Sequence, residues 1–309
     1  LMIRRPPRST LSSSSAASDV YKRQWYFFIP RSEDDIAHYL DWRKVNEVFN
    51  TNSVGFVSGR DSLTVGFTEQ EVWTRINNFM RMDVELARQS FKLGNDSRDW
   101  KVDSAQNDIK GSGPAHELIK RFTYRPFDKR FTYYTGNSRG FYSSPQKAIM
   151  EHMLDVDNNI ALVLSKRVEG NKGWEHVFMV DSIVSHHSVS MKEVNYLFPL
   201  YLAKKKQSKK VNLQSMILFE PEVEYGDKDR IPNVDRKLLE RLNYVYNESL
   251  PPEDILYYVY GILFCNTYRE RYSEYLRIDF PRIPFTANAK VFKQVAALGA
   301  QLARCNLAS

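Results

Sequence analysis

The chain has 309 residues, with 44 lysines and arginines against 37 aspartates and glutamates, so its formal net charge is +7. Hydrophobic residues make up 42% and aromatic residues 13%, which supports a real folded core. No run approaches the roughly 18 apolar residues of a membrane span, so no membrane segment is expected. Cys265 and Cys305 lie far apart in apolar patterns, which indicates neither a disulfide framework nor a zinc site and favours a reducing, cytoplasmic setting.

The first 24 residues differ from the rest in composition. Residues 1–24 contain a four-serine run and several arginines with almost no apolar periodicity, as in an adapter-derived leader of a gene model. A basic disordered tail and an organelle transit peptide are the alternatives, whereas a secretory signal would need an apolar core of about 7–15 residues. The remaining 285 residues carry 39 cations and 36 anions, a net charge of +3. A case for nucleic-acid binding therefore depends on where charge lies, not on its total. We predict that this leader is disordered and dispensable.

Helices separated by turns are predicted after the leader. SEDD at 32–35 and TEQE at 68–71 are capping patterns, each followed by apolar residues at helical spacing. Residues 55–67 alternate around glycine and aspartate, which predicts a short strand, a turn and a second short strand. Residues 92–114 are polar and glycine-rich, so we expect a surface connection and a soft domain boundary there.

Strands dominate the pattern from residue 120 onward. Within this region Ser144 and Pro145 predict the start of a helix over 143–154, because serine caps helices and proline suits the first helical position. The predicted strands are 127–134, 159–166, 176–184 and 194–202.

The last part of the sequence is predicted to be helical. PPED at 251–254 places prolines and then acidic residues at a helix start. A second amphipathic helix is expected over 268–278, followed by an extended crossing over 279–285 and a third helix. The buried stripe of the first helix is expected to be Ile255, Leu256, Val259, Ile262 and Leu263. The apolar face of the third helix is expected to be Val291, Val295, Leu298, Leu302 and Cys305.

Sequence motifs for catalysis are missing. There is no phosphate-binding G-x-x-x-x-G-K-[ST] motif, no G-x-G-x-x-G motif and no Asn-Pro-Pro-aromatic signature of the kind that amino-methylating enzymes use to hold a flipped base. His176, His186 and His187 lie near Asp181, but no complementary spacing supports a metal site over ordinary strand-end histidines. The sequence predicts no catalytic, cofactor-binding or metal site in this chain.

The stretch YRPFDKRFTYY at 124–134 combines five aromatic and three basic residues. With strand periodicity, Phe127, Lys129, Phe131 and Tyr133 share one face, while Asp128, Arg130, Thr132 and Tyr134 share the other. One interpretation is structural: the rings belong to the core, and Asp128 pairs with Arg130 in solvent. The other is that a cation of this stretch contacts a phosphate or a guanine edge.

Two groups of cations are therefore candidate DNA contacts. The first lies in or beside the aromatic strand, where a side chain can be held against a base edge, and the second lies in a polar tract suited to phosphates. The candidates in the strand and its loop are Arg125, Lys129, Arg130 and Arg139. The candidates in the polar tract are Lys204, Lys205, Lys206, Lys209 and Lys210.

The order of these segments over about 116–307 resembles the C-terminal specificity region of type ISP restriction–modification enzymes. The resemblance rests on YRPFDKRFTYY, a helix containing MEHML, NNIALVLSKR, WEHVFMVDSIVSHHSVS, YLFPLYL and the long motif PPEDILYYVYGILFCNTYRERYSEYLRIDFPRIPF. In that family one chain carries a nuclease, an ATP-dependent translocase, an adenine-N6 methyltransferase and a target-recognition domain. The loop SRGFYSSPQ departs from the family in having few basic residues, which weakens the assignment of individual contacts.

The resemblance implies an α+β fold, with a mixed or antiparallel sheet recognition domain and a C-terminal helical subdomain. The expected parts are 25–114 after the methyltransferase core, a target-recognition domain over 115–250 and helices over 251–309. Its expected partners are double-stranded DNA and, in cis, upstream methyltransferase, translocase and nuclease domains that bind S-adenosylmethionine, ATP and Mg²⁺. Two alternatives stay open: an enzyme of unrecognised pattern, and an interaction or structural module without DNA contact.

Overall fold

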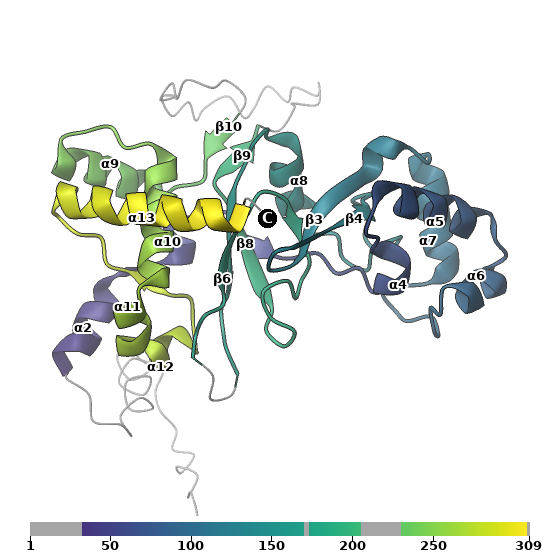
Figure 1. Ribbon diagram of the computed structural model, residues 1–309, viewed down its shortest axis with the longest axis horizontal. Helices are drawn as coiled ribbons and strands as arrows, with labels where there is room; N and C mark the ends of the chain where they lie inside the picture. The colour runs from purple at the N-terminus through teal and green to yellow at the C-terminus, as the bar shows by residue number, and fades with distance from the viewer. Residues whose placement is uncertain (1–32, 170–172, 205–229, 308–309) are drawn as a thin grey trace, which may run out of the picture. The chain divides into compact units, whose positions relative to one another are not determined.

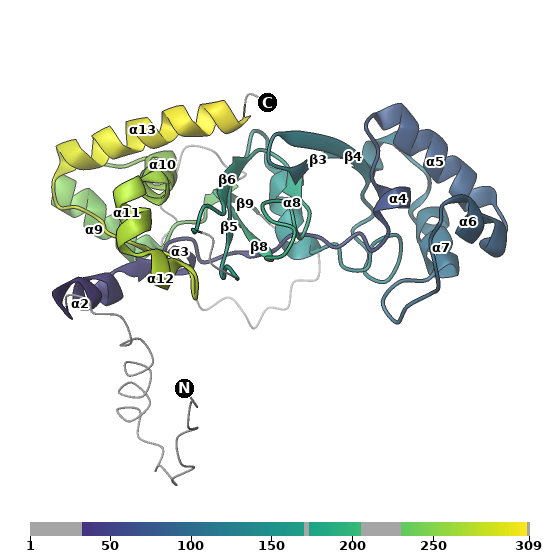
Figure 2. The same ribbon diagram turned by 60° about the horizontal axis from the view of Figure 1, so that its bottom comes forward.

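The computed structural model describes residues 33–169, 173–204 and 230–307 of the chain. These residues form the predicted α+β fold (Figures 1 and 2), and the predicted leader lies outside them. The chain divides after Trp42 into two compact units. Helix α2 (Glu33–Asp41) belongs to the first, where a helix is predicted, and every other element belongs to the second. Among the described residues, no helix is long and apolar enough to cross a membrane.

Most elements in the first part of the second unit are helices, and side-chain caps mark the starts of two of them. Helix α5 (Glu69–Arg81) begins after Thr68, whose hydroxyl oxygen accepts a hydrogen bond from the Glu71 N–H at 3.1 Å, as the capping pattern predicts. Asp83 caps α6 in the same way. The other helices of this part are α3 (Val45–Val48), α4 (Asp61–Thr64), α6 (Val84–Ser90), α7 (Val102–Ser112) and the 3₁₀ helix η1 (His116–Leu118).

The strand–turn–strand predicted over 55–67 is wrong. Helix α4 occupies its centre, and the flanking residues form single bridges to distant segments, Phe56 to Ser185 and Gly66 to Phe131. The alternation in the sequence therefore comes from residues that pair elsewhere in the fold and not with one another.

The connection predicted over 92–114 is also wrong, because most of its second half is α7. The buried face of this helix includes Ala105, Gln106 and Ile109. The Gln106 side-chain amide donates to the Phe79 and Met82 carbonyls at 2.8 and 2.9 Å, so burial leaves its donors satisfied. The buried face includes the small Ala105 and the polar Gln106, so the sequence lacks the apolar spacing that predicts an amphipathic helix.

The strands form two main sheets. One has the order β2–β8–β5–β6 with antiparallel neighbours, and the other has the order β4–β3–β7, in which β3 and β4 are an antiparallel hairpin and β7 is parallel to β3. All four predicted strands are present, but 176–184 divides into β6 and β7, 194–202 divides into β8 and β9, and β3 was not predicted. The bounds are β2 (Ser53–Val54), β3 (Ile119–Arg125), β4 (Asp128–Tyr133), β5 (Ala161–Ser165), β6 (Val177–Val180), β7 (Ile183–Val184) and β8 (Asn195–Pro199).

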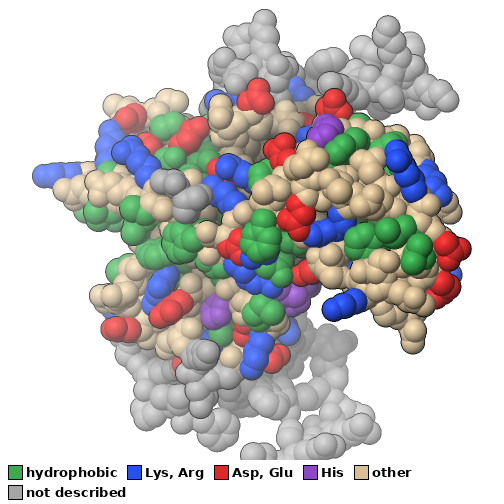
Figure 3. Space-filling view, turned by 45° about the vertical axis from the view of Figure 1, so that its right-hand side comes forward, with side chains coloured by type: hydrophobic (Ala, Val, Ile, Leu, Met, Phe, Trp, Pro, Cys, Tyr) green, Lys and Arg blue, Asp and Glu red, His purple; other side chains and the backbone are tan. Residues whose placement is uncertain are grey.

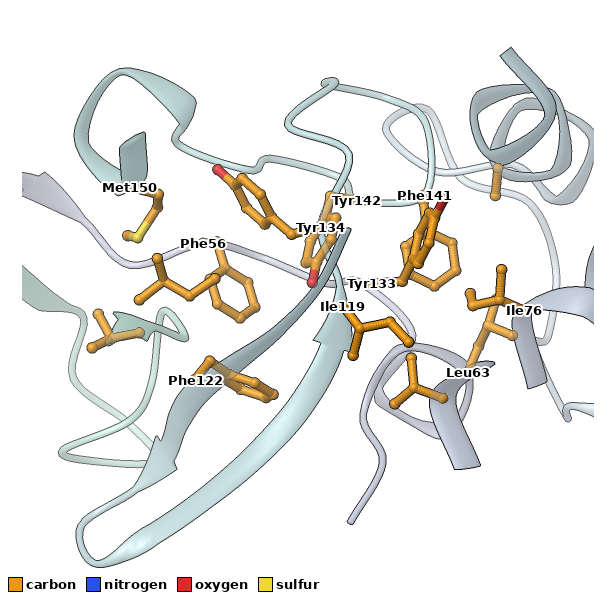
Figure 4. Packing of buried hydrophobic residues seen from close by; sticks show 14 of the residues in the cluster. Phe56, Leu63, Ile76, Ile119, Phe122, Tyr133, Tyr134, Phe141, Tyr142 and Met150 are labelled. Atoms are coloured by element: carbon orange, nitrogen blue, oxygen red, sulfur yellow. The ribbon is translucent and has the colours of Figure 1, made fainter. Parts of the chain in front are cut away.

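A cluster of buried side chains joins the hairpin to the helices on one side and to the larger sheet on the other (Figure 4). Phe56 lies at its centre, with ring centroids 5.2 Å from Phe122 and 5.1 Å from Tyr142. Burying one such ring stabilises a fold by about 1.5–3 kcal/mol. This packing anchors β3 in the core through Phe122.

Helix α8 (Lys147–Asp155) covers part of this core with its predicted apolar face of Ile149, Met150 and Met153. Its predicted cap is wrong. The N-cap residue is Gln146, in the left-handed conformation with φ 54° and without a side-chain cap. The Ser144 backbone instead pairs with Val57, with N–O distances of 2.8 and 3.2 Å.

The C-terminal part is helical, as predicted. Helix α10 begins at Pro252 and buries Leu256 completely, whereas Ile262 is half-buried. The single helix expected over 268–278 is two short helices. The bounds are α9 (Arg236–Tyr246), α10 (Pro252–Phe264), α11 (Asn266–Arg271), α12 (Ser273–Leu276) and α13 (Ala289–Leu307).

Helix α13 packs along α10 through small residues, so its predicted apolar face is wrong. Val291 and Leu298 are 43% and 59% exposed. A Cβ atom on Gly299 would lie 1.9 Å from the Tyr257 carbonyl oxygen, so only glycine permits this backbone approach. The buried face is Phe292, Ala296, Gly299 and Ala303.

Tyrosines from several helices hold the predicted extended crossing. The hydroxyls of Tyr246, Tyr258 and Tyr268 donate to the carbonyls of Thr286, Pro284 and Arg282. The remaining strands form two short antiparallel pairs, β1 (Arg43–Lys44) with β11 (Arg282–Ile283) and β9 (Tyr201–Ala203) with β10 (Arg230–Pro232). The predicted domain boundaries after residues 24, 114 and 250 stay predictions.

Candidate nucleic-acid interface

The stretch singled out in the sequence is a hairpin turn with its second strand. Pro126 and Phe127 connect β3 to β4, and Phe127 adopts a left-handed conformation with φ 61°. Phe127 is 60% exposed, and its ring packs edge-on against the Phe178 ring with the centroids 5.0 Å apart. The prediction that Phe127 shares the core face with Tyr133 is therefore wrong, because Phe127 lies in the turn before the strand begins. Tyr133 is fully buried, as predicted.

One face of the hairpin carries two arginines supported by aromatic rings. The Arg130 Cζ atom lies 4.0 Å from the Phe67 ring centroid and 4.9 Å from that of Tyr124, and the Arg125 Cζ atom lies 4.1 Å from that of Tyr124. Phe67 is 67% exposed. We call Phe67, Tyr124, Arg125, Asp128 and Arg130 the arginine–aromatic cluster. Figure 3 shows lysine and arginine side chains beside hydrophobic ones on the face that it turns forward.

Arg130 and Asp128 pair within this cluster, as one interpretation of the sequence expects. The Arg130 Nε and Nη2 atoms donate to the two carboxylate oxygens of Asp128, each at 2.8 Å. This hydrogen bonding raises the pKa of Arg130. Arg125 differs, because its Nη1 donates to the Tyr124 carbonyl at 2.7 Å and no carboxylate among the described residues pairs with it.

On the opposite face of the hairpin, the cationic side chains pair with other parts of the fold. The Lys129 ammonium donates to Asp181 and to the Leu307 carbonyl at the end of α13, each at 3.2 Å. Arg121 contacts the same carboxylate oxygen at 3.2 Å. The Lys129 side chain is only 14% exposed. DNA contact by Lys129 stays a prediction from the sequence, but its ammonium already has two partners.

Arg139 lies in the loop after β4, at the end of the strand far from the turn. The Asp108 carboxylate organises this loop, since it accepts from the Thr135 hydroxyl and the Asn137 amide at 2.7 Å and from the Phe141 N–H at 2.8 Å. Arg139 is exposed, with φ 57°, and its backbone N–H donates to the Ser143 carbonyl at 3.3 Å. An ordered loop thus presents this arginine beyond the end of β4 that is opposite the turn.

The lysine candidates are only partly covered by the structure. Lys204 is exposed directly after β9, and no carboxylate among the described residues pairs with it. Lys205, Lys206, Lys209 and Lys210 lie outside the described residues. The structure therefore brings together Arg125 and Arg130, and leaves Arg139 and Lys204 on separate segments.

Sequence reasoning missed Phe67 and Asp108 as parts of this surface. Phe67 reaches Arg130 because the neighbouring Gly66 forms a bridge with Phe131, with both N–O distances 2.9 Å. Asp108 reaches the Arg139 loop from α7, a helix that was not predicted. No local pattern signals either contact, since both depend on pairing between distant segments.

The sequence matches the family model of the type ISP C-terminal specificity domain over residues 47–309. Three solved structures share its fold. The DrdV–DNA complex is 22% identical over 92% of this chain and 26% of that chain, with a TM-score of 0.59. LlaBIII, an ATP-dependent type ISP restriction–modification enzyme bound to DNA, is 20% identical over 90% of this chain and 17% of that chain, with a TM-score of 0.62.

A nuclease-deletion mutant of the type ISP enzyme LlaGI, in complex with a DNA substrate mimic, is 18% identical over 90% of this chain and 24% of that chain, with a TM-score of 0.55. The chain thus spans about a quarter or less of the length of each of these three proteins. At these identities the likeness shows the fold. No curated protein matches the sequence.

Proposed function

Since this chain belongs to the type ISP C-terminal specificity domains, we propose that it recognises a short sequence in duplex DNA through the arginine–aromatic cluster. The observation that carries the proposal is the position of two arginines on aromatic rings beside an exposed hairpin turn. The DNA in the complexes of DrdV, LlaBIII and LlaGI supports DNA as the partner.

The chemistry of the cluster suits nucleic acid. An arginine that lies on a ring is partly ordered before binding, so it loses less side-chain entropy when it contacts a ligand. Arg125 has no carboxylate partner among the described residues, so its charge is available to a phosphate. Arg139 and the lysines from Lys204 onward are further candidates for phosphate contacts, which position a protein without selecting a base sequence.

The proposal assigns catalysis to other parts of a longer protein. In it, this module presents its DNA site to an adenine-N6 methyltransferase in cis, in the cytoplasm. S-adenosylmethionine, ATP and Mg²⁺ would be bound by that methyltransferase and by the translocase and nuclease domains. The length of the similar structures, of which this chain covers 17–26%, supports such an arrangement.

A salt titration tests DNA binding directly. The full chain is titrated by fluorescence anisotropy against a random-sequence duplex over a range of salt concentrations. We expect the logarithm of the binding constant to fall linearly with the logarithm of the salt concentration, and Arg125→Gln to reduce the slope by about 0.9, the value for one phosphate contact. Arg241→Gln, which removes an exposed arginine of α9, is the matched control. Absence of binding, or binding that does not weaken with salt, would contradict the proposal.

A further inference from the structure

The two arginines of the arginine–aromatic cluster contact different parts of the DNA, and this inference rests on the proposed function. We infer that Arg130 donates to the edge of a guanine base, and that Asp128 is the positioning residue that aims its guanidinium. The sequence left two alternatives for Arg130: a pair with Asp128 or a contact with DNA. In this inference Arg130 makes both contacts, because the pair with Asp128 orients the guanidinium that donates to the base.

Asp128 leaves some of the hydrogen-bond donors of Arg130 unused. A guanidinium carries five N–H groups in one plane. Asp128 accepts from Nε and Nη2, which form the side edge of the group. The end edge, formed by Nη1 and the other hydrogen of Nη2, remains. Two parallel donors on this edge match the O6 and N7 acceptors of guanine in the major groove.

The aromatic rings restrict the orientation of this edge. The Arg130 Cζ atom lies 4.0 Å from the Phe67 ring centroid and 4.9 Å from that of Tyr124. The Tyr124 hydroxyl is itself anchored, since it donates to Asp61 at 3.1 Å. The Arg130 side chain is 21% exposed, against 53% for Arg121 on the other face. Arg130 is thus held by a carboxylate and a ring while part of it still faces solvent.

The charge of the pair favours a base over a phosphate. The negative charge of Asp128 opposes the positive charge of Arg130, which weakens long-range attraction to a phosphate but leaves the free donors of the end edge intact. Among the bases, only guanine offers two adjacent acceptors in the major groove, because adenine presents one acceptor and one donor there. Arg125 keeps its charge and suits the neighbouring phosphate.

The test selects duplexes from a pool with a randomised central window, using the full chain and its variants, and sequences the bound fraction. Arg130→Lys keeps the charge but loses the bidentate edge, and Asp128→Asn keeps the shape but removes one acceptor from the pair. Asp181→Asn removes the carboxylate on the opposite face and is the matched control. Thermal unfolding and affinity for random DNA are measured for each variant.

We expect the parental chain to enrich a motif that contains guanine. Arg130→Lys should lower the preference for guanine at one position by about 5- to 150-fold, the range that a bidentate pair supplies, and Asp128→Asn should relax the same position by less. Random-DNA affinity and thermal stability should stay near parental, and Asp181→Asn should leave the motif unchanged.

Any one of four results would overturn the inference. An unchanged motif with Arg130→Lys would exclude Arg130 as a base contact while leaving DNA recognition itself intact. An unchanged motif with Asp128→Asn alone would exclude the positioning role. Loss of preference at all positions, together with a lower melting temperature, would mean that the pair only stabilises the hairpin. If the parental chain enriches no motif, the proposed function fails and the inference fails with it.

Discussion

The β3–β4 hairpin and the α10–α13 helix pair are both rich in aromatic residues, but they use them differently. In the helix pair Tyr258, Tyr260 and Phe292 are buried, and the backbones approach closely at Gly261 and Gly299. At the hairpin turn Phe67 and Phe127 are mostly exposed, and arginines lie on Phe67 and Tyr124. Aromatic content alone therefore does not distinguish a core from an exposed surface, whereas the exposure of the rings does.

This difference predicts a separation of effects. Substitutions in the helix pair should lower stability without changing DNA preference, because that region supports the fold. Substitutions in the arginine–aromatic cluster should change DNA binding with little loss of stability, because exposed ion pairs contribute about 0–1 kcal/mol.

The largest expected effect is the loss of a buried leucine from α10. Leu256 is fully buried, so Leu256→Ala should lower the free energy of unfolding by about 2–5 kcal/mol, as core truncations do. Ile262→Ala, at a half-buried position of the same helix, should cost clearly less. Chemical denaturation of both variants checks this order. Equal losses would mean that the two positions are equally buried in solution.

A smaller loss is expected from crowding the contact between α10 and α13. Gly299→Ala should cost about 1–3 kcal/mol, because the added carbon would collide with the Tyr257 carbonyl. Gly111→Ala in α7 is the control, since no atom lies within 4 Å of the added carbon. It should stabilise the protein by up to about 1 kcal/mol through helix propensity. A stabilising Gly299→Ala would refute the close packing.

A substitution of Lys129 tests whether the two faces of the hairpin have different roles. Lys129→Gln should lower stability by about 1 kcal/mol, because Asp181 loses a partner and the end of α13 loses a cation near its carbonyls. Its effect on affinity for random DNA should be smaller than that of Arg125→Gln. Melting curves and anisotropy titrations on the two variants check both statements. A greater loss of affinity with Lys129→Gln would place the DNA on the other face.

The smallest expected effect is the acid sensitivity of the segment around β11. Burial by itself would raise the pKa of Asp279, but hydrogen bonds from Lys44 and the Phe280 N–H outweigh burial and lower it. The stability that Asp279 contributes is therefore present above the unfolded-chain pKa of about 3.9 and is lost as the pH falls through the folded value.

Stability curves between about pH 6 and pH 2 should thus be flatter for Asp279→Asn than for the parental chain. Asp254 supplies the opposite control, because burial and the nearby Glu253 raise its pKa. Relative to Asp254→Asn, the parental chain should gain stability as the pH falls through that raised value. A parallel response of all three proteins would exclude both shifts.

The sequence predicted elements well where one local pattern determines them. The cap at Thr68, the buried face of α8 and the strand β5 follow from residues within one turn or one strand. The buried face of α13 did not follow, because a close helix crossing selects glycine and alanine and leaves larger apolar residues such as Leu298 in solvent.

The candidate site shows the same limit. The pair between Asp128 and Arg130 was expected because residues two apart on a strand share a face. The contact of Phe67 with Arg130 was not, since it crosses 63 positions and depends on the bridge between Gly66 and Phe131. Composition indicated that the hairpin was unusual, but only the tertiary structure separates its two faces.

The central claim is that one face of the hairpin contacts DNA and the other does not. Two double variants remove the same charge from the same hairpin, Arg125→Gln with Arg130→Gln on one face and Arg121→Gln with Lys129→Gln on the other. The direct measurement is the affinity of each for one random-sequence duplex at a fixed low salt concentration. We expect a clear loss of affinity for the first double variant and a near-parental affinity for the second. Equal losses, or a larger loss for the second, would contradict it.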